Sequence, residues 1–440
     1  MPSNRIFVVR EMRHNKVIPI NTDSNDISKD ELKDELAEYI EKNQGLDIES
    51  PYNDSEFFRS IKPVIYFLRV FGLFFKRYKY NGKWQTDGWI IMCIFMCCIQ
   101  LFNLARSCLV YSGSDEFDEL LFFKIQSTIW TLENAVKMLG LMYALFKKNK
   151  LPLFFQLWTT TCKDKPLGKH LKAVMKFSLM ISTNFVIVNI SSLILAFLAV
   201  PELGDLFLHA TWPGIVGSSN NLMFKVMFTI CVFVNSGIAM YSVAFMIVLC
   251  FALSREFYEV TDEIKSFVEK DGGFSGDLES IRLRHQGLCR MTNILDDSFM
   301  VVIAIVYIAD VPMSCIILYN AIYVQHTLAL TLLNVFWMVI LMVHMTIVSI
   351  VCALINVAAH TPLEELYRIS ASQLQNQQIQ LIMFMNRLTG GEVGLTAIKM
   401  FIINRPTILT VIGMLITYFV LLVQFKTPAT AICHCNSTSS

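Results

Sequence analysis

Seven long apolar stretches constrain the fold of this 440-residue chain more than any other feature. A helix needs about 20 apolar residues to cross the hydrocarbon core of a bilayer. The composition agrees, since 54% of the residues are hydrophobic and only 17% are charged, against about 25% in soluble domains. We therefore predict an all-α protein, a seven-span transmembrane helical bundle. The stretches are Gly88–Val110, Ile125–Phe146, Phe177–Val200, Val226–Leu253, Met300–Tyr323, Leu328–Ala358 and Thr407–Phe425.

Lysine and arginine are concentrated in alternate loops, which predicts the direction of the spans. Basic residues lie ahead of the first span, between the second and third, in residues 254–298, and ahead of the last span, whereas the opposite loops hold few. Basic loops stay in the cytosol. The chain is therefore predicted to have a cytosolic amino terminus and an extracellular carboxyl terminus. A G-protein-coupled receptor also has seven spans, but its amino terminus is outside.

Polar segments flank the spans and separate them. Residues 1–56 are polar and mixed in charge, without the apolar core of a signal peptide, and are predicted to be a cytosolic tail. Phe57–Phe75 is apolar but broken by charged residues and a proline. We interpret it as an amphipathic or re-entrant segment at the cytosolic surface, with an eighth span as the alternative. Residues 57–358 then hold the first six spans, and residues 254–298 extend two of their helices into the cytosol, with a break at residues 271–273.

The remainder of the chain is assigned to three further segments. Residues 359–405 are predicted to be cytosolic helices: Pro362–Leu388 has apolar residues at helical spacing, and Val393–Ile403 leads into the last span. Residues 406–425 form that span. Residues 426–440 form an extracellular tail with a glycosylation sequon at Asn436.

Ionisable residues inside apolar stretches are candidates for function because they are costly in lipid. Glu133 and Lys137 are four residues apart, in the order that favours an intrahelical ion pair. Asp310 is followed by Pro312, which removes a backbone donor and bends the helix. We predict that Asp310 faces a polar cavity or pairs with Arg106 or Lys137. Arg106 itself either extends outward to the interface or lines the same pocket.

Other residues within the spans have weaker claims. Trp130 and Trp337 suit an aromatic wall around a ligand, and packing is the competing explanation. The cysteines within the spans act as small hydrophobic residues. Interhelical hydrogen bonds account for the remaining polar residues, namely Asn184, Asn189, Asn235 and His344. The predicted ligand pocket comprises Arg106, Trp130, Glu133, Lys137, Asp310 and Trp337.

The last span carries a polar stripe on one face. Helical spacing places Thr410, Met414, Thr417, Leu421 and Gln424 above one another. A glutamine in lipid is costly, so Gln424 is expected to face protein or water. One helix cannot enclose water, whereas several copies around an axis can. The alternative is that the threonine and glutamine side chains bond to neighbouring helices.

Residues 417–425, TYFVLLVQF, resemble the TYhhhhhQF signature (h, hydrophobic) of the insect gustatory receptor superfamily in every fixed position. The resemblance extends to the related odorant co-receptor. It implies a ligand-gated channel for monovalent and divalent cations, in which four identical or different subunits surround a pore in the plasma membrane of sensory cells. It also implies that Leu421 is an apolar gate with Gln424 beside it, and that residues 359–405 anchor the subunits together. A small molecule would bind among the first six spans.

Nematode members of the superfamily imply a second stimulus, light or hydrogen peroxide, with Trp130 and Trp337 as candidate absorbing or redox groups. A transporter or a G-protein-coupled receptor is a third alternative, which the missing inverted repeat and the lysine distribution oppose. The sequence contains no paired catalytic groups, phosphate-binding loop or metal cluster, and its formal net charge is +1. We therefore expect no enzymatic activity, no cofactor or metal, and no nucleic-acid partner.

Overall fold

The computed structural model describes residues 8–10, 17–19, 55–80, 83–112, 119–146, 150–162, 168–199, 201–212, 222–269, 272–323, 328–370, 372, 374 and 377–425. The predicted tail of residues 1–56 lies mostly outside this part of the chain, and residues 426–440 with Asn436 lie wholly outside it. The chain divides into two compact units, residues 1–50 and 51–440. In the first unit, β1 (Val8–Arg10) pairs antiparallel with β2 (Val17–Pro19).

Each of the seven apolar stretches is helical, as predicted. The helices cover the predicted stretches to within a residue, and four of them, α5, α7, α9 and α10, extend well beyond. They are α4 (Trp89–Leu109), α5 (Glu119–Phe146), α7 (Lys169–Ala199), α9 (Leu222–Phe267), α10 (Leu278–Tyr323), α11 (Leu328–His360) and α14 (Arg405–Phe425).

Among the described residues, five helices are long and apolar enough to cross a membrane: α4, α7, α9, α10 and α11. Helix α14 is not among the five, because its continuous stretch with described burial, Arg405–Leu421, is shorter than such a span. Helix α5 carries Glu133 and Lys137 in its middle, which makes it less apolar than the five. That α5 and α14 also cross the membrane remains a prediction, as does the orientation of the chain.

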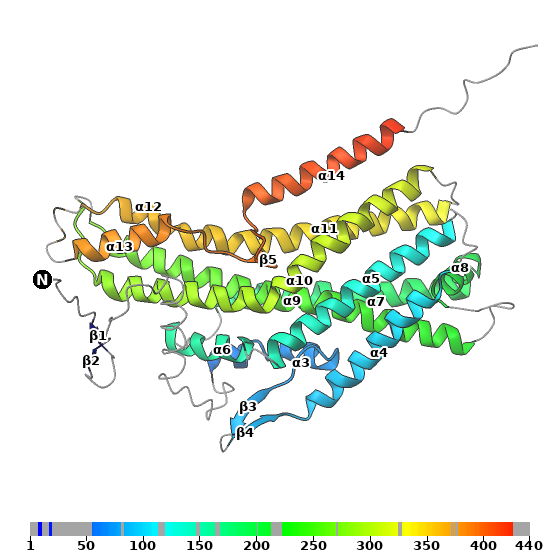
Figure 1. Cartoon of the computed structure of the whole chain (residues 1–440), viewed down its shortest axis with the longest axis horizontal. Helices are drawn as coiled ribbons and strands as arrows, with labels where there is room; N and C mark the ends of the chain where they lie inside the picture. Colours follow the sequence, from blue (N-terminus) through cyan, green and yellow to red (C-terminus); the bar gives the residue numbers. More distant parts are fainter. Residues whose placement is uncertain are drawn as a thin grey trace, which may run out of the picture. The chain divides into compact units, whose positions relative to one another are not determined.

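The helices of the second unit pack around α9 and α10. Helix α9 contacts α7 and α11, and α10 contacts α5, α11 and the shorter α6 (Lys150–Thr161). Helix α8 (Pro201–Thr211) contacts both α5 and α7. Figure 1 shows α9, α10 and α11 side by side along much of their length. Because α9 is covered by neighbours on several sides, it contributes many of the fully buried residues of the core.

The segment Phe57–Phe75 is amphipathic, as its charge pattern predicted. It forms α2 (Glu56–Ser60) and α3 (Lys62–Val70), and α3 buries Val64, Ile65 and Leu68 while leaving Tyr66 exposed. Phe57 stacks on Trp158 of α6 with ring centroids 4.0 Å apart. A two-stranded antiparallel sheet follows, β3 (Arg77–Tyr80) with β4 (Lys83–Thr86).

Helices α9 and α10 continue past their apolar stretches, and that these extensions lie in the cytosol stays a prediction. The connection between them contains an antiparallel bridge of Val268 with Phe274. Gly272 in this connection has a φ of +88°, a backbone conformation that residues other than glycine rarely adopt. Gly272 and Gly273 of the break predicted at residues 271–273 therefore lie where the chain turns back, and residue 271 lies outside the described residues.

The prediction of one helix over Pro362–Leu388 is wrong. The segment forms two helices, α12 (Pro362–Tyr367) and α13 (Gln378–Thr389). Between them, the backbone N–H of Ser370 donates to Gly272 O at 2.9 Å, and the side chain of Gln377 accepts from Leu278 N at 3.0 Å. These bonds tie the connection to the turn between α9 and α10, so they replace the hydrogen bonds of a continuous helix.

The stretch Val393–Ile403 is also not helical, which corrects the assignment of residues 359–405 to helices alone. It forms a hairpin of β5 (Thr396–Ala397) with β6 (Phe401–Ile402). Ile398 and Lys399 at its tip have φ values of +47° and +59°. Such angles are rare for a β-branched residue, which is why the sequence pattern did not predict the turn.

Gly237→Ala is expected to destabilise the bundle. A Cβ at Gly237 on α9 would lie 1.9 Å from the Phe71 ring. Overpacking of this kind costs about 1–3 kcal/mol or more, whereas glycine to alanine in an unobstructed helix gains about 1 kcal/mol. The melting temperature of the detergent-solubilised chain should therefore fall, and Phe71→Leu in the same chain should restore part of it.

Gly88→Ala is the control, because a Cβ at Gly88 meets nothing within 4 Å. A Gly237→Ala chain that melts as high as wild type would contradict this packing.

Candidate functional site

A cavity of about 600 Å³ lies among α5, α7, α8, α9, α10 and α11. Ligand sites for small molecules have volumes of about 300–1,000 Å³ and mostly apolar walls. The lining here is mainly aliphatic and aromatic, and its ionisable members among the described residues are Glu133, Asp310 and His344. The cavity therefore has the size and character of a small-molecule site with one charged region.

Helical spacing places the functional side chains on the cavity wall. Trp130 and Glu133 are three residues apart on α5, and Trp337 and His344 are seven apart on α11, so each pair shares a face of its helix. Asp310 reaches the cavity from α10. The rings of Trp130 and Trp337 are in contact, with centroids 6.0 Å apart and an interplanar angle of 59°.

The charged region is built from two buried pairs. Lys137 forms an ion pair with Glu133 one turn away on α5, as predicted, and both side chains are almost fully buried. Asp310 pairs with His344, with 2.7 Å between Oδ2 and Nδ1. One ligand atom each from Glu133, Asp310 and His344 lie within 4.8 Å of one another. The partner of Asp310 is thus His344 rather than Arg106 or Lys137.

Two of the six predicted pocket residues are absent from the cavity lining. Arg106 is buried between α4 and α8, donates to Asn103 Oδ1 at 2.5 Å and to Thr211 O, and lies 5.3 Å from the Trp212 ring. It therefore does not line this cavity. Lys137 does not line the cavity but forms an ion pair with Glu133, which does. The other four, Trp130, Glu133, Asp310 and Trp337, do line the cavity, and their contact with a ligand stays a prediction.

Two residues that the sequence ranked as weaker also line the cavity. His344 does so beside Asp310, and Asn189 does so while donating to Ser236 Oγ at 2.8 Å. The seven-residue spacing of His344 from Trp337 is the signal that could have found it. Asn235, by contrast, makes the expected interhelical bond, since it accepts from Gln100 at 2.8 Å.

Helix α14 is exposed over most of its described surface, and only Thr407, Ile408, Val411 and Leu415, on one face, are half-buried. None of its residues whose burial the structure describes is buried, and the predicted stripe of Thr410, Met414, Thr417, Leu421 and Gln424 is exposed. The two threonine hydroxyls donate within the helix, to Pro406 O at 3.0 Å and Gly413 O at 2.8 Å. Figure 1 shows α14 leaving the bundle from the β5–β6 hairpin. A helix that is apolar all round is normally covered by lipid or by other helices.

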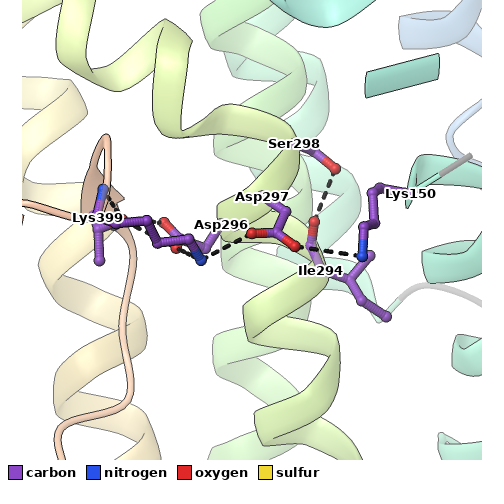
Figure 2. Close-up of polar contacts among 7 residues, drawn as sticks. Lys150, Ile294, Asp296, Asp297, Ser298 and Lys399 are labelled. Carbon is purple, nitrogen blue, oxygen red and sulfur yellow. Dashed lines mark hydrogen bonds and ion pairs between the residues drawn. The ribbon is translucent and has the colours of Figure 1, made fainter. Parts of the chain in front are cut away.

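A cluster of charges joins α10 to the hairpin that precedes α14, and Figure 2 shows it. We call Lys150, Asp296, Asp297, Thr396 and Lys399 the Asp296 cluster. Asp296 Oδ1 accepts from Thr396 N at 2.6 Å and from its hydroxyl at 2.9 Å. Lys399 Nζ lies 2.8 Å from an oxygen of each aspartate, and Lys150 Nζ of α6 lies 3.4 Å from Asp297. The cluster therefore fastens the hairpin and α6 to one turn of α10.

Asp297 and Lys399 of the Asp296 cluster keep their charges over the neutral range of pH. Burial alone would raise the pKa of Asp297, but hydrogen bonds and charges of Lys399 and Lys150 outweigh it and lower the pKa below its ordinary value. Burial alone would lower the pKa of Lys399, but the two aspartates raise it. The stabilisation from Asp297 is lost only as the pH falls through its lowered pKa, and that from Lys399 only as the pH rises through its raised pKa.

These features define a class: a multi-pass helical membrane protein that encloses a largely apolar cavity of about 600 Å³. The chain belongs to the 7tm chemosensory receptor family, whose sequence model matches residues 61–427. This confirms the resemblance to the insect gustatory and odorant receptor superfamily drawn from residues 417–425.

Solved structures show the same fold. The insect olfactory receptor OR5 from Machilis hrabei in complex with eugenol is similar, with a TM-score of 0.67 and 16% identity over 83% of this chain and 98% of that one. A second structure of OR5 gives a TM-score of 0.62 and 14% identity over the same shares. Among curated proteins, no sequence matches this chain.

Proposed function

We propose that this chain is a subunit of a ligand-gated cation channel, a chemoreceptor of the gustatory type that a small molecule opens. The observation that carries the proposal is α14, an apolar helix that is exposed over most of its surface and bears an exposed stripe of more polar residues. Sister copies of α14 around an axis would cover it and enclose water between the stripes. The complex of OR5 with eugenol supports a small molecule as the stimulus.

The pore assignment gives each residue of the stripe a role. A ring of Leu421 side chains closes the path by excluding water, and widening of the ring lets water and cations through. The amides of Gln424 lie one turn further on and replace part of the hydration shell of the ion. Thr410, Met414 and Thr417 line the same water-filled path.

Assembly as a tetramer is supported by exposed apolar residues in the predicted cytosolic region. On α13, Ile379, Ile382 and Met383 are each more than half exposed. Such a surface is typical of a contact with another chain. In this proposal residues 359–405 hold four subunits together beneath the membrane, with the amino terminus also cytosolic and the receptor in the plasma membrane of sensory cells.

Leu421→Ala is expected to produce a current without ligand, because a ring of smaller side chains no longer excludes water. Gln424→Ala is expected to change the relative permeability of the open channel to cations. Whole-cell currents in a heterologous cell line measure both. Ile412→Ala is the matched control, because Ile412 is exposed on the opposite face of α14. Currents and permeability ratios that equal those of wild type in both variants, at equal surface expression, would refute the pore assignment.

A receptor for light or hydrogen peroxide is the second candidate function. The contact of the Trp130 and Trp337 rings at the cavity wall favours it, because paired indoles absorb ultraviolet light and can be oxidised. Ultraviolet light or peroxide applied to the same cells without an organic ligand separates the two stimuli. The channel architecture proposed above is the same in either case.

A further inference from the structure

The charged region of the cavity carries an imbalance of charge. Two carboxylates, Glu133 and Asp310, lie here, and Lys137 pairs with Glu133 alone, while Asp310 contacts His344. Among the described residues, no lysine or arginine lines the cavity. Asp310 is thus a buried carboxylate without a lysine or arginine partner in an apolar surrounding, where an unpaired charge is costly. A positive charge supplied from outside the chain would stabilise this arrangement.

The polar atoms around this charge are acceptors of hydrogen bonds. Asp310 Oδ1 is buried and has no partner among the described residues, while Oδ2 is bonded to His344. His344 Nε2 also has no partner in the described chain. Glu133 adds a second carboxylate within 4.8 Å. Because ionised carboxylates only accept, a ligand that fits both of them is one that donates several hydrogen bonds.

An ammonium group has these properties, with three N–H donors, no acceptor and one positive charge. The rest of the cavity defines what the ammonium is attached to. Trp130, Phe336 and Trp337 line it as well. Aromatic faces attract both a cation and an aromatic ring. A bare metal ion would use the acceptors but would leave most of the 600 Å³ unfilled.

We propose that the cavity binds a small organic amine in its ammonium form, with the nitrogen at Asp310, His344 and Glu133 and an aromatic body against the two tryptophans. The inference rests on the proposed function, since it names the ligand class of the same site. It goes further in that an alcohol or an ester of the same shape is a poor ligand, because neither brings the missing charge.

The test compares 2-phenylethylamine with 2-phenylethanol, which share a skeleton and differ in the charged group. Calorimetry on the full-length, detergent-solubilised chain at neutral pH measures both affinities. The amine is expected to bind at least about tenfold more tightly, equivalent to about 1.4 kcal/mol. Asp310→Asn should remove that preference, chiefly by weakening the amine. Asp262→Asn is the control, because Asp262 is an exposed carboxylate on α9 outside the cavity.

Each outcome bears on the inference. An alcohol that binds wild type as tightly as the amine overturns it, even if Asp310→Asn does not fold. So does an Asp310→Asn chain that keeps the amine preference. Zinc chloride that binds saturably and excludes the amine shows a metal site instead.

Current recordings separate this inference from the channel proposal. If the amine binds but evokes no current, the channel proposal is refuted and the proposed ligand class is retained. If other compounds evoke currents and the amine does not bind, only the proposed ligand class is refuted.

Discussion

Lys137→Met is expected to cost about 3–5 kcal/mol of stability, the penalty for breaking a buried ion pair from one side. Lys137 is fully buried, and its ammonium neutralises Glu133. Methionine fills a similar volume but leaves Glu133 and Asp310 as two buried carboxylates close together, without the lysine that pairs with Glu133. The melting temperature of the detergent-solubilised chain should fall steeply, and less folded protein should elute at the size of the intact particle.

Two further chains show whether charge or packing causes the loss. In Glu133→Gln with Lys137→Met, both charges are gone, so much of the melting temperature should return. Lys176→Met removes an exposed lysine of α7 and should leave the melting temperature unchanged. If the double variant melts no higher than Lys137→Met alone, shape rather than charge is the cause, and the account of this pair is wrong.

The contrast between the two buried pairs explains how much of the site the sequence could predict. Glu133 and Lys137 are one turn apart on one helix, so their spacing alone places them in contact. Asp310 and His344 are on different helices, and their contact depends on the rotation and height of α11 against α10. Periodicity predicts the face of a helix that is polar but not the neighbour that faces it. The same limit explains Arg106, whose partner Thr211 O is on α8.

The fold shows the same division between local and distant causes. The apolar stretches are helical because length and composition decide a membrane helix locally. The hairpin before α14 depends instead on Asp296, which is 100 residues earlier in the chain and bonds to Thr396. The break between α12 and α13 likewise depends on Gly272 O, which accepts from Ser370 N. Where a distant acceptor fixes the backbone, a local pattern cannot reveal it.

Asp296→Asn is expected to lower the ligand-evoked current at least about tenfold while leaving ligand affinity nearly unchanged. Asp310 at the cavity and Asp296 are on the same helix, 14 residues or about 21 Å apart, so a shift of α10 on binding reaches both. Asp296 transmits that shift to the hairpin through Thr396 and Lys399, and the hairpin leads directly into α14. Asparagine can still accept from Thr396 N but presents no charge to Lys399.

Concentration–response curves for evoked current and calorimetric dissociation constants, both taken on the same variant, test this coupling. Asp297→Asn should reduce the current less than Asp296→Asn does. Asp297 contacts Lys399 and Lys150, but it is Asp296 that accepts from Thr396. Lys399→Met should resemble Asp296→Asn, because it removes the same ion pair from the other side. Full currents in Asp296→Asn at normal surface expression would mean that α10 moves α14 by another route. A matching loss of affinity would mean that Asp296 shapes the cavity itself, since a pure coupling residue changes what binding does and not how tightly the ligand binds.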